Sequence, residues 1–330
     1  MKNTEFKTER IGLVANPGKP VWKQAIEQAR HLIEASGREV IYEDHLLSVD
    51  AFQTEGMEVI RETAERSDIL MVFGGDGTML HAARSLQGTP TPLLGINTGG
   101  LGFLTAAPVE DLEATLQKVW KGQLSLDKRP YIRSHLTGEN ESTTDLTAVN
   151  DFVISRGMAS RMIELEVIID GQLLTQYRCD GFIISTPTGS TAYSLSAGGA
   201  VVSPGANVFT LTPICPHTLS NRSVIVDMQS TIEVRILSTR VETVLTADGQ
   251  KQIELAPNDQ VRIHAIPDQV QILNLPENSF FNTLRQKMHW SGSHVTRPKE
   301  ELRVAQPALC ITLGSDQVAG IRDRKELPLS

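Results

Sequence analysis

The feature that most constrains the fold is the stretch Asp68–Leu80, with the sequence DILMVFGGDGTML. Five apolar residues, 69–73, run without a break into the glycine-rich segment 74–78, GGDGT. A continuous apolar run that ends at glycines is typical of a strand buried on both faces, as in parallel sheets. Ligands bind at the carboxyl ends of such strands, so Asp76 stands where a site is expected. A tight turn with a solvated aspartate is the alternative that this stretch leaves open.

Strands and helices alternate over residues 1–125. The expected strands are 11–15, 40–42, 69–73 and 93–96, and the expected helices are 20–36, 54–66, 78–86 and 109–122. This order predicts βαβ units with a parallel sheet, hence an α/β N-terminal nucleotide-binding domain. A second glycine loop, Gly95–Leu104, follows the strand after GGDGT, and we expect the two loops to be neighbours. Its glycines either contact a ligand or pack beneath the first loop.

The pattern changes near residue 126, where helical periodicity gives way to short apolar runs separated by turn residues. The expected strands are 146–149, 152–154, 163–169, 182–185, 209–211, 224–226, 232–237, 241–245, 261–266 and 270–275. These runs predict a β-rich second domain over residues 126–277. A helix within residues 278–291 is expected to return to the first domain, and residues 293–330 are expected to be a poorly ordered tail.

Composition excludes several classes of function. The net charge of −8 and the aromatic content of 5% argue against a nucleic-acid binder or a binder of anionic membranes. Three widely spaced cysteines fit neither a disulfide framework nor a zinc site, and we expect free thiols in the cytoplasm. There is no apolar signal segment and no P-loop motif. The histidines lack metal-ligand spacing, so no metal held by the protein alone is expected.

Two further polar clusters stand out. Asn150 and Asp151 precede an apolar run and offer an amide beside a carboxylate, although such a pair is more often a turn. The segment Arg178–Ser196 carries a strand into PTGSTAYSLS, whose hydroxyls and backbone N–H groups suit a phosphate or a ribose. Tyr193 is placed to stack on a base. A Ser/Thr-rich surface loop is the alternative, weakened by the apolar residues 182–184.

Taken in order, these clusters resemble the NAD kinase family. The matching motifs are GGDGT at 74–78, the glycine loop at 95–104, STPTGSTAY at 185–193, PICPH at 213–217 and FNTLRQKMHW at 281–290. The resemblance covers about residues 10–291. It implies transfer of the γ-phosphoryl group of ATP to the 2′-hydroxyl of the adenosine ribose of NAD. It also implies a sandwich-like β-rich C-terminal domain and a homo-oligomer, dimer or tetramer, whose subunits share the site.

The resemblance assigns roles to individual positions. Asp76 is the implied base on the 2′-hydroxyl. The implied nucleotide-binding residues are Gly74, Gly75, Gly77, Thr78, Asn150, Asp151, Arg161, Arg178, Asp180, Thr188, Thr191, Ala192, Tyr193, Ser194, Leu195, Ser196 and Gln250. Mg²⁺ or another divalent cation is expected to arrive with ATP, because phosphate oxygens and water are its usual ligands.

Two other functions fit parts of the sequence. GGDG also occurs in lipid kinases, but the chain has no basic amphipathic segment to bring such an enzyme to a membrane. A catalytically silent dinucleotide sensor would bind NAD without turnover, and the retained Asp76 argues against it. Both of these alternatives predict that the protein does not form NADP when it is given NAD and ATP.

Overall fold

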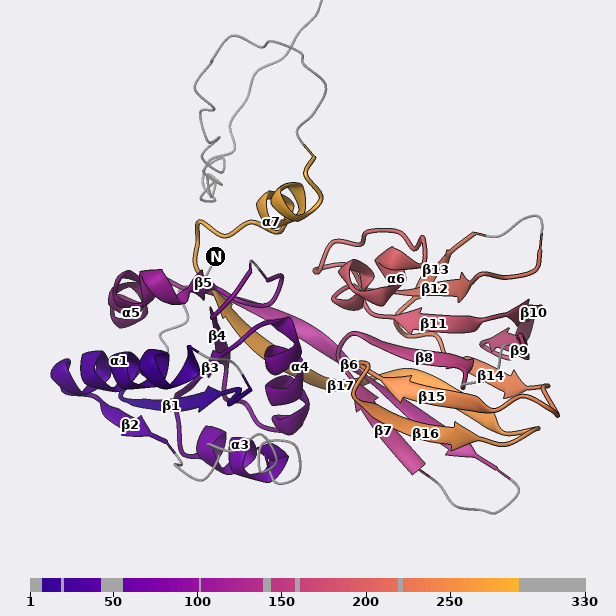
Figure 1. Ribbon diagram of the computed structural model, residues 1–330, viewed down its shortest axis with the longest axis horizontal. Helices are drawn as coiled ribbons and strands as arrows, with labels where there is room; N and C mark the ends of the chain where they lie inside the picture. The colour runs from indigo at the N-terminus through magenta and orange to yellow at the C-terminus, as the bar shows by residue number, and fades with distance from the viewer. Residues whose placement is uncertain are drawn as a thin grey trace, which may run out of the picture. The chain divides into compact units, whose positions relative to one another are not determined.

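The computed structural model describes residues 8–18, 21–42, 56–100, 102–138, 144–157, 161–218 and 222–290 (Figure 1). The predicted tail at 293–330 lies outside these residues, as do Leu101 and the first residues of the helices expected at 20–36 and 54–66. The residues up to Trp290 form one compact unit.

The first part of the chain forms the predicted parallel sheet. Its strands lie side by side in the order β4 (Leu93–Asn97), β3 (Ile69–Phe73), β1 (Arg10–Ala15) and β2 (Glu39–Ile41), and every neighbouring pair is parallel. The short strand β5 (Ala107–Pro108) pairs with β4. The adjacency of β3 and β4 brings the two glycine loops together, as expected.

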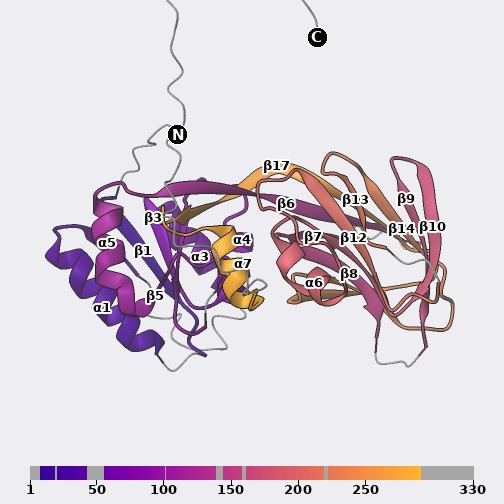
Figure 2. The ribbon, with the colours of Figure 1, turned by 90° about the horizontal axis from the view of Figure 1, so that it is seen from above.

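Helices cover both faces of this sheet (Figure 1; Figure 2). They are α1 (Trp22–Ala35), α3 (Gly56–Glu65), α4 (Asp76–Ser85) and α5 (Leu112–Trp120), the last preceded by the 3₁₀ turn η2 (Val109–Asp111). In β3, Leu70 and Val72 pack in one core with residues of α3 and α4, whereas Met71 and Phe73 pack in another with residues of α1 and α5. This two-sided burial is why β3 is a continuous apolar run.

The second part of the chain is the predicted β-rich fold. A six-stranded antiparallel sheet has the order β13 (Val224–Asp227), β12 (Val208–Ile214), β11 (Gly181–Ser185), β8 (Asp151–Arg156), β15 (Thr243–Ala247) and β16 (Lys251–Leu255). Its inner residues, such as Phe182 and Phe209, share a core with Leu165 and Val234 of the other sheet. The two sheets thus pack face to face, as in a sandwich.

That other sheet has eleven strands and includes the parallel strands. Its remaining members are β6 (Ser125–Thr137), β7 (Thr144–Ala148), β9 (Ile163–Ile169), β10 (Gln172–Cys179), β14 (Ile232–Ile236) and β17 (Gln260–Asn274). The long strands β6 and β17 pair antiparallel, and β17 also pairs parallel with β4 through Ile272 and Leu93. The domain boundaries at residues 125 and 277 therefore stay a prediction.

Several strand predictions were incomplete. β6, β10 and β16 were missed because their sequences mix polar and apolar residues, and pairing with neighbouring strands fixes them instead. The strands expected at 261–266 and 270–275 are one strand, β17, with a register shift between Ala265 and Gln269. Such a shift lets a strand bend without ending. α4 begins at Asp76 and not at Thr78, so the aspartate lies in the first helical turn.

The C-terminal described helix, α7 (Phe280–Lys287), packs beside the second glycine loop. The ring centroids of Phe280 and Phe103 are 6.1 Å apart, and Asn278 donates a hydrogen bond to the carbonyl oxygen of Ala106. Lys118 of α5 pairs with Glu277 just before the helix. These contacts bring the end of the described chain back to the loops that follow β4.

Candidate active site

Asp76 is held by the second glycine loop. Its carboxylate oxygens accept hydrogen bonds from the backbone N–H groups of Phe103 and Leu104, both at 2.9 Å. A Cβ atom added to Gly102 would lie 2.4 Å from Asp76 Oδ1, so only glycine fits there. A carboxylate has about four acceptor positions, so Asp76 can still accept a hydrogen bond from another donor. Gly102 therefore packs beneath the first loop, which was one of the two interpretations of this segment.

Different physical reasons explain why glycine occupies each of these positions in the first loop. A Cβ atom at Gly74 would meet the Thr78 hydroxyl at 2.4 Å, so Gly74 is required by packing. Thr78 itself is buried. Added Cβ atoms at Gly75 and Gly77 would meet nothing within 4 Å, so packing does not explain these glycines. The absence of a side chain at these two positions leaves the backbone open to close approach by a ligand.

A buried carboxylate, Asp248, organises the second cluster. It accepts hydrogen bonds from the backbone N–H groups of Val149, Asn150 and Asp151, the shortest being 2.7 Å from Asn150. It also pairs with the guanidinium of Arg84 of α4 at 2.9 Å, and both side chains are buried. Asn150 thus lies in the bend before β8 and Asp151 is the first residue of that strand, and Asp248 holds the backbone of both.

A chain of polar contacts joins this cluster to the first glycine loop. Arg84 donates to the side-chain oxygen of Gln250, and the Gln250 amide donates to the carbonyl oxygen of Gly77 at 3.2 Å. Arg84 was not among the predicted site residues. Its position eight residues after Asp76, on the same helix, was the available signal.

Asp151 and Asn150 face a cavity of about 330 Å³. Besides these two residues, the cavity is lined by Val153, Ser155, Ala192, Tyr193, Thr246, Asp248 and Gly249. Burial, together with the nearby charge of Asp248, raises the pKa of Asp151 to about 7. The buried Asn150 Oδ1 atom has no hydrogen-bond partner among the described residues, so it is available to a ligand.

The Ser185–Ser196 segment lies over the Asn150 turn and divides into structural and accessible residues. The 3₁₀ turn η3 (Gly189–Thr191) packs so closely that a Cβ atom at Gly189 would lie 2.2 Å from the carbonyl oxygen of Asn150. In the short helix α6 (Tyr193–Ser196), Ser194 is buried and its hydroxyl bonds to Thr212 at 3.2 Å. Tyr193, in contrast, is 48% exposed.

The other predicted residues of this segment lie around Tyr193. Ala192 lines the cavity beside it, and Leu195 is half-buried whereas Ser196 is exposed. The Thr191 hydroxyl donates to the carbonyl oxygen of Thr188 at 3.3 Å. The buried Thr188 hydroxyl has no partner among the residues that the structure describes. Ser194 thus supports the segment, whereas Tyr193 and Ala192 face the cavity.

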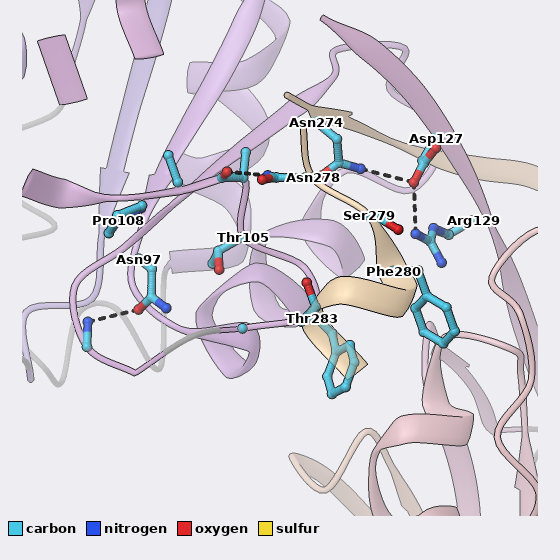
Figure 3. Close-up of a pocket in the computed structure, with 15 residues that line it drawn as sticks. Asn97, Thr105, Pro108, Asp127, Arg129, Asn274, Asn278, Ser279, Phe280 and Thr283 are labelled. Carbon is cyan, nitrogen blue, oxygen red and sulfur yellow. Dashed lines mark hydrogen bonds and ion pairs between the residues drawn. The ribbon is translucent and has the colours of Figure 1, made fainter. Parts of the chain in front are cut away.

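A second cavity, of about 230 Å³, lies between the second glycine loop and the start of α7 (Figure 3). Figure 3 shows Asn274 bonded to Asp127 and Asp127 bonded to Arg129 on one side, with Asn97 on the other. Gly102 and Phe103 line it, so its wall includes the loop that holds Asp76. Arg129 is 6% exposed, and burial lowers its pKa. Among the described residues, no three His, Cys, Asp or Glu side chains gather as a metal site.

Arg161 and Arg178 lie elsewhere on the chain. They line a separate cavity of about 490 Å³ together with Glu164 and Arg240. Arg178 and Asp180 precede β11, whereas the Thr186–Ser196 segment follows it. Asp180 pairs with Arg156 at 3.0 Å, beside Ser155, which is the strand partner of Gly181 and lines the cavity of Tyr193. Arg161 and Arg178 thus line a different cavity from Tyr193, whereas Asp180 precedes the residue whose strand partner lines the Tyr193 cavity.

The sequence comparisons agree with these motifs. Residues 11–124 match the family described as ATP-NAD kinase N-terminal domain, and residues 149–275 match the ATP-NAD kinase C-terminal domain. The chain is 38% identical over 293 residues to a protein named NAD kinase from Nitrosomonas eutropha, covering 88% of this chain and 98% of that protein.

The chain belongs to the NAD kinase family. A second family member, NAD kinase from Nitrosomonas europaea, is 42% identical over 233 residues, covering 71% of this chain and 78% of that protein. Among family members of known structure, yeast NADH kinase complexed with NADH has a TM-score of 0.77 and 27% identity, covering 88% of this chain and 90% of that chain. An NAD kinase from Archaeoglobus fulgidus in complex with ATP has a TM-score of 0.65 and 27% identity, covering 86% of this chain and 100% of that chain.

Within the described part of the chain, no helix combines the length and apolar character that a membrane span requires.

Proposed function

We propose that this protein is an ATP-dependent NAD kinase that phosphorylates the 2′-hydroxyl of the adenosine ribose of NAD. The observation that carries the proposal is the continuous set of contacts from the turn of Asp76 to the cavity of Asn150 and Asp151, through Gly77, Gln250 and Arg84. The first cluster supplies a carboxylate, and the second supplies an amide, a carboxyl group and an exposed aromatic ring for a dinucleotide.

Asp76 acts as the base in this proposal. The 2′-oxygen of the ribose bonds to the γ-phosphorus of ATP, and the bond from that phosphorus to the β,γ-bridging oxygen breaks. The bridging oxygen leaves with the electron pair as part of ADP, and the hydroxyl proton passes to Asp76 and then to water. A carboxylate is too weak a base to ionise the free hydroxyl. It orients the hydroxyl and accepts the proton as the new bond forms.

A divalent cation fits this site when it is delivered by ATP. Asp76 is a single, partly exposed carboxylate that two backbone N–H groups already hold. Such a donor set suits Mg²⁺ that keeps phosphate oxygens and water as its main ligands. When bound, the cation neutralises charge on the β- and γ-phosphate oxygens.

A homo-oligomer, dimer or tetramer, accounts for Arg178 and Asp180. Arg178 lines a different cavity from Tyr193 within one chain, and in this proposal a second copy brings its Arg178 and Asp180 to a shared site. We expect the enzyme to act in the cytoplasm. Both cysteines in the described residues, Cys179 and Cys215, are free thiols, which suits a reducing compartment.

The test is an assay with purified protein, NAD, ATP and Mg²⁺, in which an NADP-specific dehydrogenase detects the product. We expect NADP formation that requires all three additions. Absence of NADP together with tight NAD binding would favour the silent sensor. Phosphorylation of diacylglycerol or a sphingoid base without NADP formation would favour the lipid kinase.

A further inference from the structure

Lys287, in the last turn of α7, reaches the base of the proposed reaction from the far end of the described chain. Its Nζ atom lies 3.9 Å from Asp76 Oδ2 and 4.8 Å from the ring centroid of Phe103. Phe103 is the residue whose backbone N–H holds that same carboxylate oxygen. Of the lysines and arginines in the described residues, none besides Lys287 comes within 4 Å of the Asp76 carboxylate.

α7 is fixed so that this side chain points at the site. Phe280, Leu284 and Lys287 recur at spacings of four and three residues, which places them on one face of the helix. Phe280 packs against the Phe103 ring, and Leu284 is buried at 4% exposure. The Phe103 ring under the ammonium adds a cation–π contact. The apolar face of α7 thus presents one cation to the loop that holds Asp76.

Stability does not explain the pair. The separation of 3.9 Å is long for a charge-assisted hydrogen bond, and both side chains are 32% exposed. Exposed ion pairs contribute at most about 1 kcal/mol. Asp76 is already positioned by Phe103 and Leu104, so it does not need the ammonium for orientation. Lys287 is therefore a cation near the reacting groups that is not committed to its neighbour.

We propose that Lys287 is a catalytic residue whose ammonium contacts the phosphoryl group during its transfer from ATP to the ribose hydroxyl. This role rests on the proposed function. As the 2′-oxygen bonds to the γ-phosphorus and the bridging oxygen leaves on ADP, negative charge is spread over the phosphoryl oxygens. Asp76 adds a negative charge beside them, and a cation at this point offsets the repulsion between phosphate and carboxylate. The ammonium donates up to three hydrogen bonds.

The test compares Lys287→Met and Lys287→Arg with a matched control, Arg285→Gln. Arg285 is a basic residue in the same helical turn, is exposed, and bonds to Asn282 of its own helix. We expect Lys287→Met to lower kcat about 100-fold, the usual loss for one electrostatic contact made in the transition state, with the KM for NAD changed less than about threefold. Lys287→Arg keeps the charge and should recover at least about a tenth of the wild-type rate.

A second measurement separates chemistry from structure. Binding of NAD and ADP with aluminium fluoride, an analogue of the phosphoryl group in transfer, is followed by calorimetry. Lys287→Met should weaken binding of the fluoride complex about as much as it lowers kcat, whereas NAD alone binds as in the wild type. The control Arg285→Gln should match the wild type in both measurements.

Two results would overturn the role of Lys287. In one, wild-type protein makes NADP and Lys287→Met keeps kcat within about threefold, which leaves the kinase function standing. In the other, Lys287→Met and Arg285→Gln lose equal activity, which assigns the effect to the helix. If wild-type protein makes no NADP at all, the proposed function fails and this role fails with it.

Discussion

Asp76 is held by backbone groups that lie 27 and 28 residues further along the chain. This arrangement fixes the carboxylate without a partner side chain such as histidine. It also explains Gly102, because the carboxylate occupies the space of a Cβ atom. The GGDGT motif and the second glycine loop are therefore one structural unit, although each looks complete in the sequence.

Asp76→Asn should abolish turnover while NAD binding stays within about threefold of the wild type. The substitution is not structurally silent, because the asparagine amide would face one of two backbone N–H groups. We expect a loss of about 1–3 kcal/mol in the free energy of unfolding, measured in urea. A kcat near the wild-type value would contradict the assignment of Asp76 as the base.

Asp151 should make stability depend on pH. In the folded protein its pKa is raised to about 7, whereas an unfolded chain has about 3.9. Between these values the folded state holds a proton that the unfolded state releases, so stability is fully present below about pH 4 and falls as pH rises through 7. Asp151→Asn should remove up to roughly 1.4 kcal/mol of this loss per pH unit.

Urea unfolding at pH 5 and pH 7.5 measures this difference. Asp111→Asn, at an exposed position outside the site, is the control and should keep the wild-type slope. Equal slopes in wild-type protein and Asp151→Asn would show that Asp151 carries its charge in the folded state.

At the scale of elements, the pair Arg84–Asp248 joins α4 to the turn before β8 and to the β15–β16 turn. The two elements that carry Asp76 and Asn150 come from distant parts of the chain. A buried, hydrogen-bonded ion pair between them sets their spacing, because it has few alternative geometries. Gln250 extends the connection to Gly77.

Arg84→Leu should lower the free energy of unfolding by about 3–5 kcal/mol, because Asp248 would remain buried without its countercharge. The double variant Arg84→Leu with Asp248→Asn should lose less than the sum of the two single variants. Gln250→Ala, at an exposed position, should lose no more than about 1 kcal/mol. Chemical unfolding of the wild type and the four variants measures these values, and additive losses would contradict a coupled pair.

At the scale of the whole molecule, Arg178 and Tyr193 line different cavities of one chain. A site shared between copies predicts complementation. If Asp76→Asn chains and Arg178→Ala chains are mixed and reassembled, hybrid oligomers contain one site with both native residues. If the oligomer is a dimer and the two nearly inactive variants are mixed in equal amounts, we expect about a quarter of the wild-type activity. Activity no higher than the average of the unmixed variants would place Arg178 outside a shared site.

The sequence by itself determined those strands and helices whose buried residues form a recognisable pattern along the chain. The apolar run of β3 and the alternation of strands and helices fixed the α/β part, since two-sided burial leaves a pattern that neighbouring residues reveal. The motifs GGDGT and STPTGSTAY indicated the NAD kinase family, and the comparisons confirm it. Strands such as β6 and β10 left no such pattern, because their pairing partners decide them.

The tertiary structure alone decided how the site is assembled. Three contacts of the site join residues that are far apart in the sequence. The second glycine loop holds Asp76, Arg84 pairs with Asp248, and Lys287 approaches Asp76. A hydrogen bond or an ion pair depends on distance in space, which residue types and spacing along the chain do not fix. For the same reason only the structure shows that Arg178 and Tyr193 line different cavities, although just fourteen positions lie between their numbers.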